Sequence, residues 1–211
     1  MRPLEDLSQL LFPTRCFGCN AIGVSICSVC RHEWHSHYYS THISQMRVHS
    51  AVIYSSTASK ILLSAKENGL KAADSLIIDS IVHVIAKATF DHHNIRLIPI
   101  PSSNSARRRR GRSFIVDIAT RVGQETSLPV SDSLEIIRKV RDQSGLQSKA
   151  RSKNMEGAFA LKRGAFPRGD LILVDDVVTT GATLREAARA LTSQGFHVLA
   201  SVTACVAQPL R

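Results

Sequence analysis

Two kinds of hydrophobic pattern alternate along most of this chain. Short continuous apolar runs have the length of buried strands, and they lie at 51–54, 97–100, 134–137, 171–174 and 197–206. The stretches between them have the length and spacing of helices, and these lie at 59–68, 74–90, 112–126 and 182–193. Continuous apolar strands separated by helices are typical of a parallel sheet covered on both faces. The pattern therefore predicts an α/β fold.

The N-terminal part of the chain has a different character. Residues 4–11 have the leucine spacing of a short amphipathic helix, which Pro13 would end. Residues 16–43 are rich in cysteine and histidine and contain few side chains that could form an ordinary core. We therefore expect two units, an N-terminal helix and metal-binding module at 1–43 and the α/β domain at 44–211.

Four of the five cysteines form two pairs of the Cys-x2-Cys type, and seven residues separate the pairs. The first pair is Cys16 with Cys19, and the second is Cys27 with Cys30. Each pair can direct two thiolates at one ion, so together they suit a closed tetrahedral zinc site. We expect this zinc to be structural, because a segment this small needs a bound metal ion or a similar cross-link to be stable.

We do not expect the fifth cysteine or the nearby histidines to be the main zinc ligands. Three histidines follow the cysteine pairs and are interpreted as surface residues, with a role as substitute zinc ligands as the alternative; they are His32, His35 and His37. The fifth cysteine, Cys205, lies in an apolar strand and is expected in the core.

The composition is that of an ordinary globular protein, with 44% hydrophobic and 21% charged residues in a chain of 211. No apolar run approaches the ~20 residues that a membrane-spanning helix needs. The first residues include Glu5 and Asp6 and no long apolar stretch, so a secretory signal is not expected. We therefore expect a cytoplasmic protein, in which disulfides are a poor alternative to zinc.

The net charge of +10 is concentrated in one part of the sequence. Residues 107–153 hold twelve basic and five acidic side chains, whereas residues 1–43 hold three of each kind. A local basic excess favours a polyanionic ligand such as a diphosphate or a nucleic acid. The alternative is that part of this charge forms a solvated surface.

The most informative stretch is LILVDDVVTTGAT at 171–183. Four apolar residues lead into Asp175 and Asp176, and a turn rich in threonine and glycine then opens a helix. Ligands of α/β sheets bind at the carboxyl ends of the strands, and free N–H groups at the start of a helix attract anions. Two carboxylates beside an anion site are useful if the ligand also offers hydroxyl groups or a metal ion. A helix N-cap, the alternative, explains one aspartate but not the pair with its turn.

This stretch resembles the phosphoribosyl-pyrophosphate (PRPP) motif of the type I phosphoribosyltransferases. The resemblance implies that Asp175 and Asp176 bind the ribose 2′- and 3′-hydroxyls and that residues 179–183 bind the 5′-phosphate. A Mg²⁺ ion would bridge the ribose hydroxyls and the pyrophosphate. The substrate-binding residues implied around the turn are Val177, Val178, Thr179, Thr180, Gly181, Ala182 and Thr183.

With the cysteine pairs in front of it, the chain resembles the ComF/GntX family over nearly its whole length. LIPIP at 97–101 and RRRRGR at 107–112 are similar to the family's Val-Pro-Val-Pro strand and Arg-rich turn. A second similar pattern is formed by Gln143, Leu146, Arg151, Asn154, Gly157 and Phe159. One departure is that many members continue the Arg-rich turn with Gly-Phe-Asn-Gln, whereas this chain has SFIV at 113–116.

Two further segments are expected to complete a diphosphate pocket. Pro101, Ser102 and Arg109 follow the strand at 97–100 and would overhang the edge of the sheet that carries the aspartates. The polar stretch 138–157 is long enough for an active-site lid, and Arg138 and Arg151 are its candidates for neutralising a leaving pyrophosphate. For each of these basic side chains, the alternative is a solvated position.

Three functions are compatible with these features. The first is an enzyme that transfers ribose 5-phosphate from PRPP, or a related phosphorylated ribose, to an acceptor that the sequence does not identify. The second, implied by the ComF resemblance, is an accessory protein of competence that acts in the uptake of single-stranded DNA. The third is a PRPP-sensing regulator without catalysis.

We expect any role in DNA uptake to depend on a partner protein. The segment 107–153 contains a single aromatic residue, Phe114, whereas proteins that bind single strands normally stack bases on several aromatic rings. Weak or no direct binding of nucleic acid is therefore expected, and the partner would be a helicase or another DNA-processing protein. The sequence leaves a homodimer open.

Overall fold

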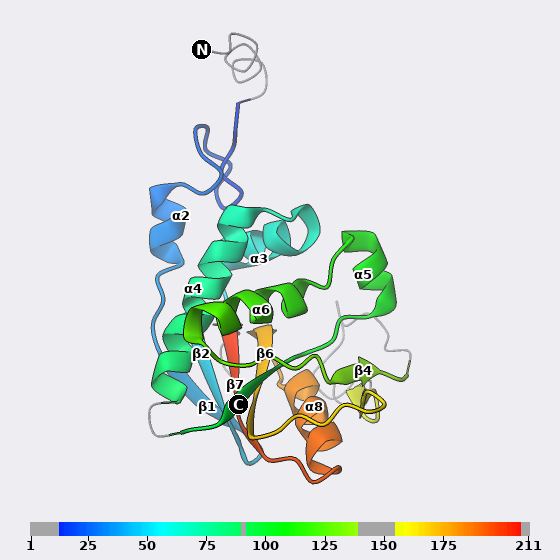
Figure 1. Cartoon of the computed structure of the whole chain (residues 1–211). Coiled ribbons are helices and arrows are strands. Elements are labelled where there is room, and N and C mark those ends of the chain that lie inside the picture. The colour runs from blue at the N-terminus through cyan, green and yellow to red at the C-terminus, as the bar shows by residue number, and fades with distance from the viewer. Residues whose placement is uncertain (1–12, 90–91, 139–154, 208–211) are drawn as a thin grey trace.

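A computed structural model describes residues 13–89, 92–138 and 155–207 of the chain (Figure 1). The helix predicted at 4–11 and the candidate residue Arg151 lie outside these described residues. Within them, every helix is too short or too polar to span a membrane.

The centre of the molecule is a five-stranded sheet in the order β1-β2-β7-β6-β3. Its strands are β1 (Tyr39–Ile43), β2 (Met46–Ile53), β3 (Ile95–Pro99), β6 (Asp170–Val178) and β7 (Val198–Val206). All neighbours pair in parallel except β1, which runs antiparallel to β2 at the edge. The predicted α/β fold with a parallel sheet is therefore confirmed.

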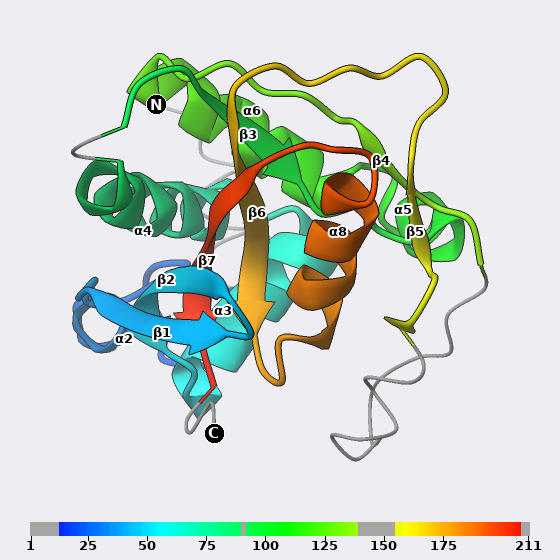
Figure 2. The same ribbon diagram turned by 90° about the horizontal axis from the view of Figure 1, so that it is seen from below.

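Helices cover both faces of this sheet and bury a separate apolar cluster on each. One cluster joins the sheet to α3 (Ser56–Asn68), α4 (Lys71–Ala88) and α6 (Phe114–Thr126), and the other joins it to α8 (Ala182–Thr192). Figure 2 shows α4 and α8 on opposite sides of β6 and β7. The interior strands are buried on both faces, which explains why they appear in the sequence as continuous apolar runs.

The apolar run at 134–137 does not belong to the central sheet. Its strand, β4 (Leu134–Ile136), pairs antiparallel with β5 (Phe159–Leu161) in a separate two-stranded sheet. Leu134 is buried whereas Glu135 is exposed, so β4 buries one face only. This hairpin packs beside α8 and contributes to the same apolar cluster. Its strand β5 was not predicted, because three residues carry too little pattern.

The Arg-rich segment forms a helix rather than a turn. Helix α5 spans Asn104–Arg110, and the hydroxyl of Ser103 caps it by accepting a hydrogen bond from the N–H of Ala106 at 3.2 Å. Gly111 ends it in the left-handed conformation, with φ of 68°. The helix buries no residue and therefore has no apolar periodicity by which the sequence could have predicted it.

The N-terminal cysteine-rich segment packs onto the α/β domain. It contains the short helix α2 (Ser28–Glu33), and Cys16, Cys30 and Trp34 belong to the same apolar cluster as α3 and α4. The indole N–H of Trp34 donates to the carbonyl of Leu76 at 3.1 Å and to the hydroxyl of Ser80 at 2.9 Å, both on α4. Residues 39–43 of the same segment enter the central sheet as β1.

Candidate functional site

The two adjacent aspartates lie near the carboxyl end of β6, at the edge of the sheet where ligands bind in such folds. The strand continues past them to Val178. Val174 pairs with Pro99 and Asp175 pairs with Thr203, so the aspartates are level with the end of β3 and with the interior of β7. The register therefore brings the start of the segment after β3 beside the carboxylates, as the sequence predicted.

The turn that follows β6 forms a small pocket. Asp175 and the residues from Val177 to Leu184 line it, and this set includes all seven substrate-binding candidates around the turn, among them residues 179–183 expected to bind the phosphate. The hydroxyl of Thr180 accepts a hydrogen bond from the N–H of Ala182 at 3.4 Å, and α8 begins at Ala182. The first N–H groups of an α-helix have no partner within it, so this pocket offers donors to an anion.

Gly181 is required by the shape of the turn. Its φ of 70° is in the left-handed region, where other residues are strained. A Cβ atom at this position would also collide with the side chain of Ile43 on β1. The edge strand therefore packs directly against the turn, and only glycine fits between them.

Asp175 and Asp176 have different surroundings. Asp175 lines the turn pocket, and its Oδ1 accepts a hydrogen bond from the N–H of Asp176 at 2.9 Å. Burial raises the pKa of Asp175 well above its usual value, and the neighbouring charge of Asp176 raises it further. Asp176 is itself buried, and its Oδ2 forms an ion pair with Nζ of Lys66 on α3.

Lys66 was not predicted at this site from the sequence. Burial alone would lower the pKa of its ammonium group, but the charges of Asp176 and Asp175 outweigh burial and raise it. A signal was present in the spacing, because Lys66 follows the buried Ala58 and Leu62 at intervals of four residues. A lysine on the buried face of a helix requires a partner for its charge.

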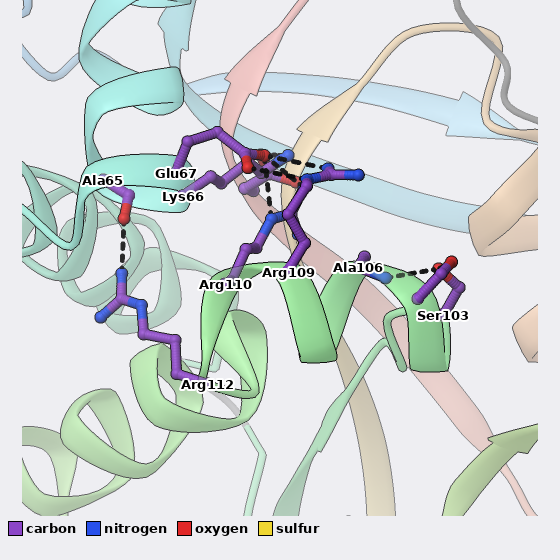
Figure 3. A network of polar contacts seen from close by, with 10 residues as sticks. Ala65, Lys66, Glu67, Ser103, Ala106, Arg109, Arg110 and Arg112 are labelled. Atoms are coloured by element: carbon purple, nitrogen blue, oxygen red, sulfur yellow. Dashed lines mark hydrogen bonds and ion pairs between the residues drawn. The ribbon is translucent and has the colours of Figure 1, made fainter.

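The other residues in the last turn of α3 hold the arginines of the Arg-rich segment (Figure 3). Glu67 pairs with Arg109, at 3.2 Å between Nε and Oε2, and with Arg110, at 2.8 Å between Nη2 and Oε1. Arg112 donates to the carbonyl of Ala65 at 2.7 Å and forms two hydrogen bonds of 2.7 and 2.8 Å with Asp74 of α4. These arginines therefore connect helices, and Arg109 is not placed in the turn pocket.

The candidate residues after β3 line a second, larger pocket. Pro101, Ser102 and Arg138 face it together with Arg107, Arg108 and the β4 strand. Arg138 also donates a hydrogen bond to the carbonyl of Glu156 at 2.6 Å. This bond connects the two ends of the predicted lid at 138–157. The structure thus separates the predicted ligand residues into a turn pocket and this neighbouring basic pocket.

The four N-terminal cysteines converge on one point. Their sulfur atoms all lie within 4.8 Å of one another, and Sγ of Cys19 is 3.6 Å from Sγ of Cys27. Among the described residues, no histidine joins this group, and His32, His35 and His37 are exposed. The four thiols therefore fit a closed zinc site, as predicted from their spacing.

The backbone around the cysteines favours a thiolate at Cys16. Burial on its own raises the pKa of Cys16, but the N–H groups of Cys27, Cys19 and Gly18 outweigh it and lower the pKa to about 6. Burial and the neighbouring thiols raise the pKa of Cys30. Four thiolates cannot share this space without a cation, which a zinc ion would supply.

Comparison with known proteins agrees with this architecture. Residues 106–209 match the phosphoribosyl transferase domain family. The chain is 30% identical over 104 residues to Competence protein F of Haemophilus influenzae, an alignment that covers 48% of this chain and 45% of that protein. The chain thus spans about half the length of this curated relative.

Two solved structures align with most of this chain at low sequence identity. Orotate phosphoribosyltransferase from Aeropyrum pernix is 16% identical, with a TM-score of 0.43 over 83% of this chain and 77% of that chain. Adenine phosphoribosyltransferase from Leishmania donovani is 11% identical, with a TM-score of 0.42 over 80% of this chain and 86% of that chain.

Proposed function

We propose that this ComF-type phosphoribosyltransferase, with its N-terminal four-cysteine cluster, binds PRPP together with Mg²⁺. The observation that carries the proposal is the partly buried Asp175 and the buried Asp176 beside a threonine- and glycine-rich turn at the start of α8. A ligand for this arrangement needs both a phosphate and vicinal hydroxyl groups, and a phosphorylated ribose has both.

The 5′-phosphate would occupy the turn pocket. The N–H groups at the start of α8 and the hydroxyls of Thr179, Thr180 and Thr183 are uncharged donors, so they bind the anion without adding ions to the site. The ribose 2′- and 3′-hydroxyls would donate to the carboxylates of Asp175 and Asp176. Hydrogen bonds to ionised acceptors are about twice as strong as neutral ones, which favours the diol.

The pyrophosphate would lie over the ends of β3 and β6. Mg²⁺, when bound with PRPP, would neutralise part of the charge of the pyrophosphate, while Asp175 and Asp176 would hold the ribose. On the protein side, Arg138 and Arg151 are the candidates to contact the diphosphate, and the basic pocket at Ser102 and Arg107 adjoins the same strand end.

The proposed reaction is the transfer of ribose 5-phosphate. The bond between C1 of the ribose and the pyrophosphate oxygen breaks, pyrophosphate leaves with the bonding electrons, and a nucleophilic acceptor forms the new bond to C1. The protein contributes positioning and charge neutralisation rather than a nucleophile of its own. A protein that binds PRPP without turnover would act as a sensor.

A second candidate function comes from the similarity to Competence protein F. In this role the chain acts in the uptake of single-stranded DNA through a helicase or another DNA-processing partner. Several basic side chains of the positive segment are engaged within the protein, since Arg109, Arg110 and Arg112 bind acidic residues of α3 and α4. This supports an action through a partner protein rather than through tight direct binding of DNA.

Thermal unfolding with a series of sugar phosphates tests the PRPP proposal. Ligands that bind only the folded protein raise its melting temperature. PRPP with Mg²⁺ and ribose 5-phosphate should raise it, whereas 2-deoxyribose 5-phosphate, which lacks one hydroxyl, should have a smaller effect. An equal effect of ribose 5-phosphate and its deoxy analogue would contradict the diol assignment. Release of pyrophosphate from PRPP with added acceptors then separates an enzyme from a sensor.

A further inference from the structure

The ammonium group of Lys66 occupies a position beside Asp176 that a metal ion or a ribose hydroxyl could take. The side chain of Lys66 is 22% exposed and that of Asp176 is 5% exposed, so the pair is largely removed from water. The charge of Asp175 also acts on Lys66. Near the end of β6, the ammonium group of Lys66 therefore pairs with the carboxylate of Asp176 and lies within the electrostatic reach of Asp175.

The surrounding helix turn fixes Lys66 in this place. The residue before it, Ala65, has its carbonyl bound by Arg112, and the residue after it, Glu67, is bound by Arg109 and Arg110 (Figure 3). Arg110 is a second cation close enough to act on Lys66. Because Glu67 holds Arg110 at 2.8 Å, Lys66 is the cation in contact with Asp176.

Two adjacent carboxylates that are shielded from water form a natural site for a divalent cation, since such ions prefer oxygen ligands. A lysine that neutralises one of the two carboxylates makes the site less attractive to a divalent cation. A metal ion would then have to displace an ion pair in which attraction is only weakly screened by water.

We propose that Lys66 is a specificity-determining residue, which acts as an internal counter-cation and keeps free divalent metal ions from binding to Asp175 and Asp176 before the ligand arrives. The metal ion then enters the site with its anionic ligand, and the ligand's diol takes over the carboxylate that Lys66 releases. The inference deepens the proposed function and rests on it for the identity of that ligand. The exclusion of free metal concerns this chain's own residues and can be tested without PRPP.

The test measures binding of Mn²⁺ alone to the zinc-loaded protein by calorimetry. Lys66→Met removes the charge and nearly conserves the volume, and Lys66→Gln keeps an N–H donor for Asp176 without the charge. Both variants are expected to bind Mn²⁺ at least ten times more tightly than the wild-type protein. Lys66→Arg keeps the charge and should resemble the wild type. Lys60→Met removes a lysine from the same helix outside the site, and it should also leave Mn²⁺ affinity unchanged.

A double variant shows whether the new affinity uses the proposed carboxylate. Adding Asp176→Asn to Lys66→Gln should return Mn²⁺ affinity to the wild-type level. Melting temperatures provide a second readout, because Mn²⁺ should stabilise Lys66→Gln and not the wild-type protein. Unchanged Mn²⁺ affinity in both single variants would overturn the proposal, as would an increase that persists after Asp176→Asn.

The metal titration is independent of the experiments on sugar phosphates. If PRPP fails to bind while Lys66→Gln gains Mn²⁺ affinity, the proposed function falls and the counter-cation role of Lys66 stands. If PRPP binds but the variants gain no Mn²⁺ affinity, the function stands and the role of Lys66 falls.

Discussion

Asp175 and Asp176 are neighbours in sequence, yet their surroundings in the folded chain differ. Asp175 borders the turn pocket, and burial favours its neutral form, whereas Asp176 is held by the charge of Lys66. The sequence predicted both residues from the motif. It did not predict their difference, because Lys66 is more than 100 positions away and meets them only in the folded chain.

The raised pKa of Asp175 makes ligand binding dependent on pH. A carboxyl group accepts hydrogen bonds from a diol best when it is ionised, so binding should release a proton from Asp175. We therefore expect PRPP affinity to rise with pH up to the raised pKa of Asp175 and to level off above it. Calorimetry in buffers of different ionisation enthalpy measures the proton release.

Asp175→Asn is the control for this prediction, because it keeps the shape of the side chain without a titrating proton. Its proton release should be smaller than that of the wild type, and what remains belongs to the ligand's own phosphates. Equal proton release in the two proteins would show that Asp175 does not ionise on binding.

A single methyl group at Gly181 should damage both the turn and the edge of the sheet. Gly181→Ala forces a residue with a Cβ into the left-handed region, at a cost of about 1–2 kcal/mol, and it also collides with Ile43. Gly195→Ala is a matched control, because Gly195 has φ of 82° but open space around it. Denaturant unfolding should show a larger loss of stability for Gly181→Ala, and equal losses would contradict the packing of β1 against the turn.

At the level of elements, burial decides which parts of the fold the sequence could predict. The strands β3, β6 and β7 and the helices α3, α4, α6 and α8 bury apolar faces, and their patterns were visible. Helix α5 buries nothing, and β5 has three residues, so neither has a pattern long enough to detect. The placement of β4 was missed for another reason, because a strand's partners depend on the whole topology rather than on its own residues.

Arg112 should matter for stability more than Arg109. It joins the end of α3 to the start of α4, and its side chain is 23% exposed, whereas that of Arg109 is 63% exposed. Hydrogen bonds to charged groups that are partly buried contribute about 1.5–3 kcal/mol, and exposed pairs contribute less than about 1 kcal/mol. Arg112→Met should therefore lower the free energy of unfolding by about 2 kcal/mol or more. A similar loss for the control Arg109→Met would contradict this bracing role.

The N-terminal module should depend on its metal. Cys19→Ser removes one of the four converging thiols, so we expect zinc content to fall from one ion per chain toward zero and the melting temperature to decrease. Cys205→Ala is the control, since Cys205 is buried in β7 and apart from the cluster. Metal analysis by mass spectrometry measures both, and retention of a full zinc equivalent by Cys19→Ser would reject the four-cysteine site.

For the whole molecule, the sequence predicted the fold class, the cysteine cluster and a turn between β6 and α8. It could not predict which basic side chains form ion pairs within the protein and which are available to a ligand, because pairs such as Arg110–Glu67 join residues that are distant in sequence. It also could not show that Pro101 and Ser102 face a pocket separate from that of the turn. Both features depend on how α5 and the β4–β5 hairpin pack around the central sheet.

We propose one site for a phosphorylated ribose, formed by Asp175, Asp176 and the turn at 179–183. Its most direct test is calorimetric titration of the zinc-loaded protein with PRPP and Mg²⁺, compared with an Asp175→Asn, Asp176→Asn double variant. Losing two hydrogen bonds to charged acceptors should weaken binding by about a hundredfold or more. Binding by the wild type that the double variant loses, while it keeps its fold and its zinc, is the result we predict. Equal affinity in the two proteins, or no binding by the wild type, would contradict the assignment of this site.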